Sequence, residues 1–222
     1  MPTPNTTSLN VLIADDHQMV REGVRRLVES EPGWKVIAEA SNGRDAVAAA
    51  AKHQPDVAIL DIGMPGLNGL DATRQIKRDS PKTEILIFTG TETEEMVLSL
   101  FEAGARSYVL KSESRDQLIQ ALRSLAQHKP YFTSHIGEIV FARLLGKSGP
   151  AAELPERGRL TAREREIVQL LGEGSSNKEV ADTLGVSIKT VETHRAAIMR
   201  KLKLESFSDL VRYAIRNHII EA

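Results

Sequence analysis

The chain has 222 residues, which fit one large domain or two small ones at about 150 residues per domain. Its 41% apolar share supports packed cores and its 27% charged share is typical of a soluble protein, while the lack of cysteine excludes disulfides and thiolate metal sites. The first residues, MPTPNTTSLN, lack the basic and apolar regions of a secretory signal, and no apolar run approaches the ~18 residues of a membrane span. We therefore expect a cytoplasmic protein without membrane contact.

Short apolar runs alternate with helical stretches through the first 128 residues. The runs at 11–14, 35–38, 57–60, 85–88 and 107–110 are continuous and rich in Val and Ile, as strands buried on both faces are. Helical periodicity follows at 18–30, 43–53, 70–79, 94–103 and 115–128. Repeated strand–helix units predict a five-stranded parallel sheet, doubly wound, with helices on both faces. The pattern does not determine the strand order.

The pattern changes after Tyr131. One more short helix is expected at 136–145, and residues 146–156 have the composition of a flexible tether. Four helices follow, at 162–171, 177–184, 187–202 and 206–217, the first opened by a capping box of Thr161 and Glu164. The predicted domains are thus residues 1–130, a linker at 131–156 and an all-α domain at 157–222. Helix, glycine turn and helix form the helix-turn-helix plan for reading DNA.

Acidic residues and one lysine follow three of the predicted strands. Asp15 and Asp16 end the first strand, Asp61 ends the third and Lys111 ends the fifth. The carboxyl edge of an open α/β sheet is where ligands bind. Three carboxylates there repel one another unless a divalent cation joins them, and an oxygen-rich site suits Mg2+. Because a lysine beside them suits a phosphoryl group, we interpret Asp61 as a phosphorylation site.

Each of these residues also has a simpler explanation. The Asp15–Asp16 pair could cap the first helix, Asp61 could be a turn residue before Met64-Pro65, and Lys111 could be a solvated strand end. A Rossmann-like ligand site is disfavoured, because no G-x-G-x-x-G follows the first strand. The joint placement at one sheet edge favours the phosphorylation site.

The third C-terminal helix can be tested by its phase at 100° per residue. One side carries Val191, Ile198 and Leu202, with His194 and Arg195 at its margins. The opposite side carries Lys189, Thr193, Ala196 and Arg200, flanked by Glu192 and Lys203. From 187 to 203 there are five basic residues and one acidic residue, a net of +4 in a chain whose total is −1. Clustered positive charge over small polar side chains suits the major groove of DNA.

The helical phase separates the residues expected to contact phosphates from those expected to contact bases. Lys189, Arg200 and Lys203 are expected to hold phosphates, with the hydroxyl of Thr190 adding a contact. Glu192, Thr193 and Ala196 are expected to face base edges. A solvated helix face is the simpler explanation for Lys189 and Arg200. The full candidate set is Lys178, Lys189, Thr190, Glu192, Thr193, His194, Ala196, Arg200 and Lys203.

These residues together carry a resemblance to a known family over nearly the whole chain. Residues 9–128 resemble the receiver domain of bacterial two-component response regulators. Residues 157–220 resemble the LuxR-type helix-turn-helix, in Leu160-Thr161-x-Arg163-Glu164, Asn177-Lys178-Glu179-Val180-Ala181 and Thr190-Val191-x-x-His194. The combination is similar to the NarL/FixJ class of transcriptional regulators. The resemblance implies a flavodoxin-like receiver with strand order 2-1-3-4-5 and a four-helix DNA-binding domain.

The resemblance also implies residue roles. Asp61 would accept the phosphoryl group, Asp16 and Asp61 would bind Mg2+ directly, and Asp15 would act through water. The carbonyl of Gly63 would be a further ligand. Thr89 and Lys111 would hold the phosphoryl oxygens, and Tyr108 stands at the aromatic switch position. The chain departs from the family at Gly90, where alanine is more usual, which puts the switching loop rather than the chemistry in question.

The implied partners are a sensor histidine kinase as phosphodonor, double-stranded DNA and a second copy of the chain, with RNA polymerase as a further expectation. The last helix supports a homodimer, because Leu210, Val211, Ala214 and Ile215 offer more apolar surface than one core stripe needs. The chain is expected to be a regulator and not an enzyme.

Two rival functions come from other classes. A phosphatase of the haloacid-dehalogenase type also passes through an aspartyl phosphate, but it uses D-x-D-x-T, and here Ile62-Gly63-Met64-Pro65 follows Asp61. A protein-interaction adaptor would use the C-terminal helices against another protein, and the net charge of +4 on one helix disfavours it.

Overall fold

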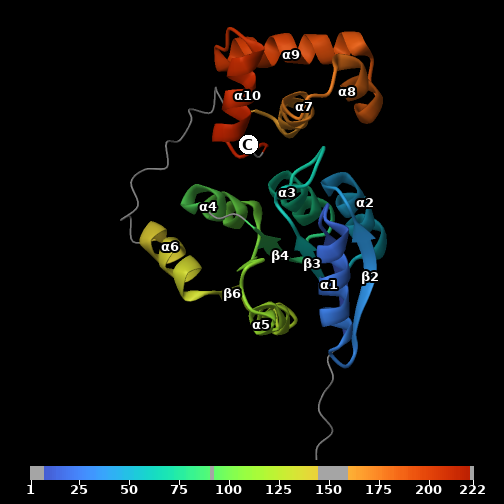
Figure 1. Ribbon diagram of the computed structural model, residues 1–222, viewed down its shortest axis with the longest axis vertical. Helices are drawn as coiled ribbons and strands as arrows, with labels where there is room; N and C mark the ends of the chain where they lie inside the picture. Colours follow the sequence, from blue (N-terminus) through green and yellow to red (C-terminus); the bar gives the residue numbers. More distant parts are fainter. Residues whose placement is uncertain (1–7, 91–92, 145–159, 221–222) are drawn as a thin grey trace, which may run out of the picture. The chain divides into compact units, whose positions relative to one another are not determined.

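The computed structural model describes residues 8–90, 93–144 and 160–220 (Figure 1). The chain divides into two compact units. Among the described residues, the first unit contains six strands and six helices, and the second contains four helices. The tether predicted at 146–156 lies outside the described residues.

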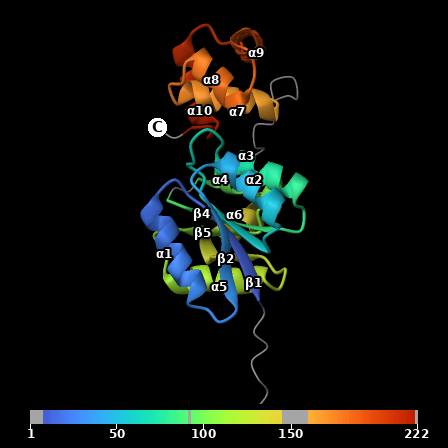
Figure 2. The ribbon, with the colours of Figure 1, turned by 90° about the vertical axis from the view of Figure 1, so that its right-hand side faces the viewer.

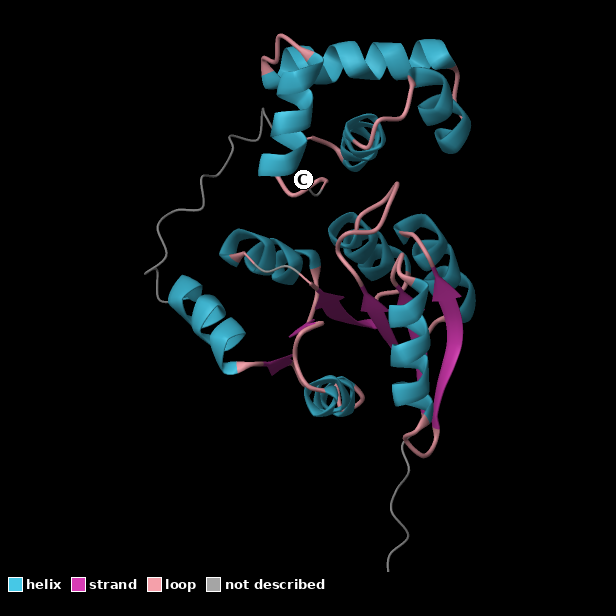
Figure 3. Ribbon diagram, viewed as in Figure 1, coloured by secondary structure: helices cyan, strands magenta, loops and turns pink. Residues whose placement is uncertain are grey.

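The first unit is a parallel sheet in the order β2-β1-β3-β4-β5-β6. This order confirms the 2-1-3-4-5 arrangement, and Figure 3 shows the strands in magenta between the helices. The strands are β1 (Leu9–Ala14), β2 (Trp34–Ala40), β3 (Val57–Leu60), β4 (Glu84–Thr89), β5 (Ser107–Leu110) and β6 (Tyr131–Phe132). β3 is buried along its whole length, because it lies inside the sheet, whereas β2 is partly exposed at the edge.

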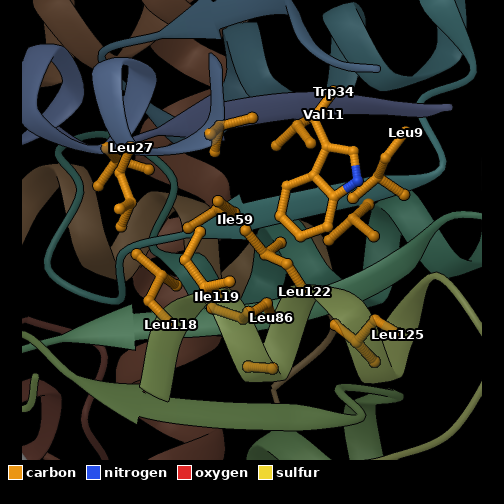
Figure 4. Close-up of a cluster of buried hydrophobic side chains, with 14 of the residues drawn as sticks. Leu9, Val11, Leu27, Trp34, Ile59, Leu86, Leu118, Ile119, Leu122 and Leu125 are labelled. Atoms are coloured by element: carbon orange, nitrogen blue, oxygen red, sulfur yellow. The ribbon is translucent and has the colours of Figure 1, made fainter. Parts of the chain in front are cut away.

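Helices cover both faces of this sheet, as predicted. They are α1 (Gln18–Glu29), α2 (Gly43–His53), α3 (Gly69–Asp79), α4 (Glu94–Ala103), α5 (Arg115–Leu125) and α6 (Ser134–Leu144). α1 and α5 pack together on one face, while α2, α3 and α4 follow one another on the other (Figure 2). Figure 4 shows Leu27 of α1 and Leu118, Ile119 and Leu122 of α5 directed at the sheet around Ile59.

The sheet has one strand more than the predicted five. β6 pairs with β5 in parallel, with Ser107 opposite Tyr131 and Tyr108 opposite Phe132. Two residues are too few to show a period, so the sequence placed them in the linker. The ring of Phe132 meets Phe101 of α4 edge-on at 4.9 Å, and α6 packs against α4 with Ile136 and Ile139 buried.

The fifth helix ends three residues before its predicted end. α5 stops at Leu125, and the chain then turns through His128, whose φ of 56° is left-handed. The amide of Lys129 donates to the carbonyl of Ser124 at 2.9 Å, which completes the helix end without a glycine. Because no glycine stands there, the residue pattern contains no signal for the end of the helix.

The second unit consists of α7 (Ala162–Gly172), α8 (Asn177–Leu184), α9 (Ile188–Leu202) and α10 (Phe207–Arg216), and its described residues contain no strand (Figure 3). The predicted capping box of Thr161 and Glu164 is present, and Ser176 and Ser206 form two more. Ile167, Val180, Val191, Ile198 and Leu210 form its core. Gly185, with φ of 63°, makes the tight turn between α8 and α9. Among the described residues, no helix is long and apolar enough to cross a membrane.

Candidate functional site

The ends of β1 and β3 bring a cluster of carboxylates together in the first unit. Asp15 and Asp16 follow β1, and Asp61 follows β3, which pairs with β1 in parallel. One ligand atom each from Asp15, Asp16, His17 and Asp61 lies within 4.8 Å of the others. Asp15 and Asp61 are buried, whereas Asp16 and His17 are exposed, so the cluster has one open side.

Lys111 joins this cluster from the end of β5. Its Nζ atom lies 2.7 Å from Oδ2 of Asp15 and 3.1 Å from Oδ2 of Asp61. Burial lowers the pKa of Lys111, but the hydrogen bond to Asp15 and the charge of both carboxylates outweigh it, so that the pKa is raised. The ammonium therefore stays charged and neutralises part of the repulsion between the two buried acids.

The pKa of the Asp61 carboxyl is raised above its ordinary value. Burial raises its pKa, and the charge of Lys111 does not cancel this effect, because the Asp15 carboxylate also raises it. Three acids and one ammonium leave an excess of negative charge at the site, so a further cation would be stabilised there.

The residues present fit Mg2+ as that cation. The donor set is dominated by carboxylate oxygens, which Mg2+ prefers, and one side is open to the water that Mg2+ keeps. The imidazole of His17 is a softer donor, and its Nδ1 atom already lies 2.7 Å from Oδ1 of Asp16. Gly63 lies two residues beyond Asp61 and is half-buried, and the use of its carbonyl as a ligand stays a prediction.

The other two predicted residues lie on neighbouring strands of the same sheet. Thr89 is the last residue of β4 and is buried, and its carbonyl accepts the backbone N–H of Lys111 at 2.8 Å. This bond fixes the two strand ends beside each other. Tyr108 is buried inside β5, between Ile87 of β4 and Phe132 of β6. Their roles as phosphoryl ligand and switch stay predictions.

Two residues that shape the acidic loop were not predicted. Nη1 of Arg21, on α1, donates to the carbonyls of Asp15 at 2.7 Å and Asp16 at 3.2 Å. The backbone N–H of His17 donates to Oδ1 of Asp15 at 2.9 Å. His17 was visible as the neighbour of two acids, but contacts to backbone carbonyls leave no residue pattern that could reveal Arg21.

In the second unit, α9 shows the predicted division into two sides. Val191 and Ile198 are buried, and His194 is half-buried at the core margin. The exposed residues of the predicted DNA-binding set are Lys178 on α8 and Lys189, Glu192, Thr193, Ala196, Arg200 and Lys203 on or next to α9. Thr190 is half-buried.

Only part of the positive charge of α9 is available to a ligand. Nζ of Lys201 pairs with Oε2 of Glu164 on α7 at 2.7 Å, and the guanidinium of Arg195 lies 5.3 Å from the centre of the Phe207 ring. Lys189, Arg200 and Lys203 form no ion pair with any residue that the structure describes. The outward face of the helix thus keeps three cations and one acid, Glu192.

Comparison with known families matches both units. Residues 11–123 match the response regulator receiver domain, and residues 159–214 match the bacterial regulatory proteins of the luxR family.

Full-length relatives give the same result. The chain is 38% identical over 212 residues to the transcriptional regulatory protein LiaR of Bacillus subtilis, covering 96% of this chain and 99% of LiaR. It is 37% identical over 219 residues to the oxygen regulatory protein NreC of Staphylococcus epidermidis, covering 96% and 100%. A solved structure of two RcsB dimers bound to two parallel DNAs is similar with a TM-score of 0.57 and 26% identity, covering 95% of this chain and 98% of RcsB.

Proposed function

The chain belongs to the two-component response regulators that carry a LuxR-type DNA-binding domain, and we propose that it is phosphorylated on Asp61 and then binds specific DNA as a dimer to regulate transcription. The observation that carries the proposal is the contact of Lys111 with both Asp15 and Asp61, at 2.7 Å and 3.1 Å. A buried acid with a raised pKa beside a charged lysine is a typical functional arrangement.

The chemistry at Asp61 is a transfer from a histidine of a partner kinase. A carboxylate oxygen of Asp61 attacks phosphorus, the P–N bond to the donor histidine breaks, and that nitrogen keeps the electron pair. Lys111 offsets the charge on the phosphoryl oxygens, and the hydroxyl of Thr89 donates to one of them. When bound by Asp15, Asp16, Asp61 and the Gly63 carbonyl, Mg2+ would supply the charge that lets two anions meet.

DNA binding is assigned to the outward face of α9. Lys189, Arg200 and Lys203 are exposed cations for phosphates, while Glu192, Thr193 and Ala196 face the groove. Oγ1 of Thr193 donates to the carbonyl of Lys189 at 2.8 Å, which leaves its methyl group for contact with thymine.

A homodimer on a two-fold site is part of the proposal. RcsB binds DNA as dimers, and in this chain Val211 and Ile215 of α10 are half-buried beside the fully buried Leu210 and Ala214. The proposal also includes contact with RNA polymerase. It further includes a location in the cytoplasm, where bacterial DNA is. We assign the chain a regulatory and not an enzymatic role, in line with its transcription-regulating relatives.

The proposal is tested by DNA binding with and without acetyl phosphate, on a duplex selected from a random pool. With acetyl phosphate and Mg2+, the wild-type chain should bind roughly 5- to 150-fold more tightly, the usual range of allosteric coupling. Asp61→Asn should show no gain, whereas Asp79→Asn, which removes an exposed carboxylate at the end of α3, should behave as wild type. An equal gain in Asp61→Asn would show that another group accepts the phosphoryl.

A further inference from the structure

Ile188 is an apolar side chain that the fold leaves in water at the start of the DNA-reading helix. It is the first residue of α9 and is 45% exposed. The other large apolar side chains left exposed among the described residues are Met19, Phe141 and Phe207, and of these only Phe207 has a partner in the second unit, the guanidinium of Arg195. Packing against the core of the second unit therefore does not explain why an isoleucine occupies this position.

The side chain lies on the same ridge as the candidate DNA contacts. Residues four apart in a helix stand in one row, and Ile188, Glu192, Ala196 and Arg200 form such a row. All four are exposed. The buried core residues Val191 and Ile198 lie about 60° and about 80° around the helix from Ile188 at 100° per residue, so Ile188 stands at the edge of the outward face. Ile188 is thus the N-terminal member of an outward row that ends in a phosphate-holding arginine.

The polar side chains next to Ile188, those of Ser187 and Thr190, form hydrogen bonds at the start of the helix. Oγ of Ser187 accepts the backbone N–H of Thr190 at 3.1 Å and lies 2.8 Å from Oγ1 of Thr190. The Ser187 hydroxyl therefore caps the helix, and the Thr190 hydroxyl is its hydrogen-bond partner. Side chains of a helix tilt toward its N-terminus, which places Ile188 at the end that a helix-turn-helix presents to base edges.

We propose that Ile188 is a specificity-determining residue that packs against the 5-methyl group of a thymine in the major groove. The inference rests on the proposed DNA binding by α9. The thymine methyl is the apolar group that base edges offer in that groove, so an exposed isoleucine there favours thymine over cytosine. Neighbours in the row are roughly 5–6 Å apart and base pairs about 3.4 Å apart, so this thymine lies one or two base pairs from the pair read by Glu192.

The test removes the side chain of Ile188 and the methyl group of the thymine, each alone and both together. The full-length chain selects a duplex from a random pool, and each thymine of one half-site is then replaced singly by uracil, which lacks only the methyl. Equilibrium binding is measured for the wild type, Ile188→Ala and Ile188→Val. Glu192→Ala identifies the base pair that Glu192 reads, which serves as the reference position. Phe207→Ala is the matched control for loss of an exposed apolar side chain in the same unit.

We expect one uracil position, one or two base pairs from the Glu192-dependent pair, to weaken wild-type binding about fourfold, the value of one buried methyl-sized group. At that position Ile188→Ala should show no uracil penalty and Ile188→Val should keep most of it, while Phe207→Ala should keep it fully. A uracil penalty at that position that persists in Ile188→Ala, or no thymine there in the selected duplex, would overturn the role of Ile188 alone. Failure to select any duplex would overturn DNA binding itself.

Discussion

Gly69 lies so close to Asp61 that a side chain cannot be added between them. An ideal Cβ atom at Gly69 would stand 2.1 Å from the carbonyl oxygen of Asp61 and 2.9 Å from Cα of Ile62. The backbone N–H of Gly69 also donates to the carbonyl of Ile62 at 2.9 Å. The start of α3 therefore rests directly on the backbone that carries the proposed phosphoryl acceptor.

Gly69→Ala should force this backbone apart. Because the clash is with main-chain atoms, we expect a loss of roughly 1–3 kcal/mol in the free energy of unfolding, as for overpacked cores. The displaced Asp61 should also react more slowly with acetyl phosphate. Urea unfolding and the initial phosphorylation rate measure the two effects.

Gly90→Ala is the matched control. An added Cβ at Gly90 meets no described atom within 4 Å, and the residue is not left-handed. We expect stability to stay the same or rise by up to about 1 kcal/mol, because alanine restricts the unfolded chain. A loss at Gly90 as large as that at Gly69 would show that the contact with Asp61 is not the cause.

Removing Asp16 should weaken Mg2+ binding more than removing Asp15. Asp16 is exposed at the open side of the cluster, whereas Asp15 is committed to Lys111 at 2.7 Å. Loss of a group that acts through water typically costs about 10–100-fold in affinity, so Asp15→Asn should fall in that range and Asp16→Asn beyond it. Titration with Mg2+, followed by calorimetry, compares them, and the reverse order would mean that the direct ligand is Asp15.

Arg200 and Lys201 are adjacent cations on α9 with different expected effects on DNA binding. Arg200 is exposed, and Lys201 pairs with Glu164. Arg200→Ala should weaken binding to all sequences alike and lower the slope of log K against log salt by roughly 1, and Lys201→Ala should leave the slope unchanged. Glu192→Ala should instead relax the preference at one base pair by roughly 1–3 kcal/mol. If Arg200→Ala changed the preferred base and Glu192→Ala did not, the helix would lie in the groove in another rotation.

The pair of Lys201 and Glu164 should make the second unit more stable at neutral than at acid pH. Burial raises the pKa of Glu164, but the hydrogen bonds from Lys201 and from the backbone of Thr161 outweigh it and lower the pKa. A lowered folded-state pKa gives stability that is present above the unfolded pKa of about 4.3 and is lost as pH falls through the folded value.

Because the Lys201–Glu164 pair is partly solvated, its contribution should be no more than ~1 kcal/mol. Thermal unfolding of the wild type and Glu164→Gln measures it, and their difference in stability should shrink below about pH 4. A difference that grows on acidification would contradict the assignment.

The sequence predicted the long elements because their apolar periods are set by burial. Val57 to Leu60 is continuous and apolar because β3 is buried along its whole length, and Val191 and Ile198 share a side because α9 packs on one core. β6 escaped prediction because two residues carry no period. For the site, the sequence placed Asp15, Asp61 and Lys111 at strand ends, which parallel pairing brings together.

The missed residues depend on tertiary contacts. Arg21 acts on backbone carbonyls, and Gly69 matters only because α3 returns to the Asp61 loop. Lys201 counts toward the net charge of α9, but its ammonium is paired with Glu164, which lies 37 residues earlier in the chain. Such contacts are fixed by packing, which the local pattern does not encode.

Intact-mass spectrometry after incubation with acetyl phosphate and Mg2+ tests the assignment of Asp61 most directly. The wild-type chain should gain one phosphoryl group, and Asp61→Asn should gain none, while Asp79→Asn should gain one as the wild type does. Lys111→Met should react more slowly, because the charge at the phosphoryl oxygens is no longer offset. Equal phosphorylation of Asp61→Asn and the wild type would contradict the assignment of Asp61 as the acceptor.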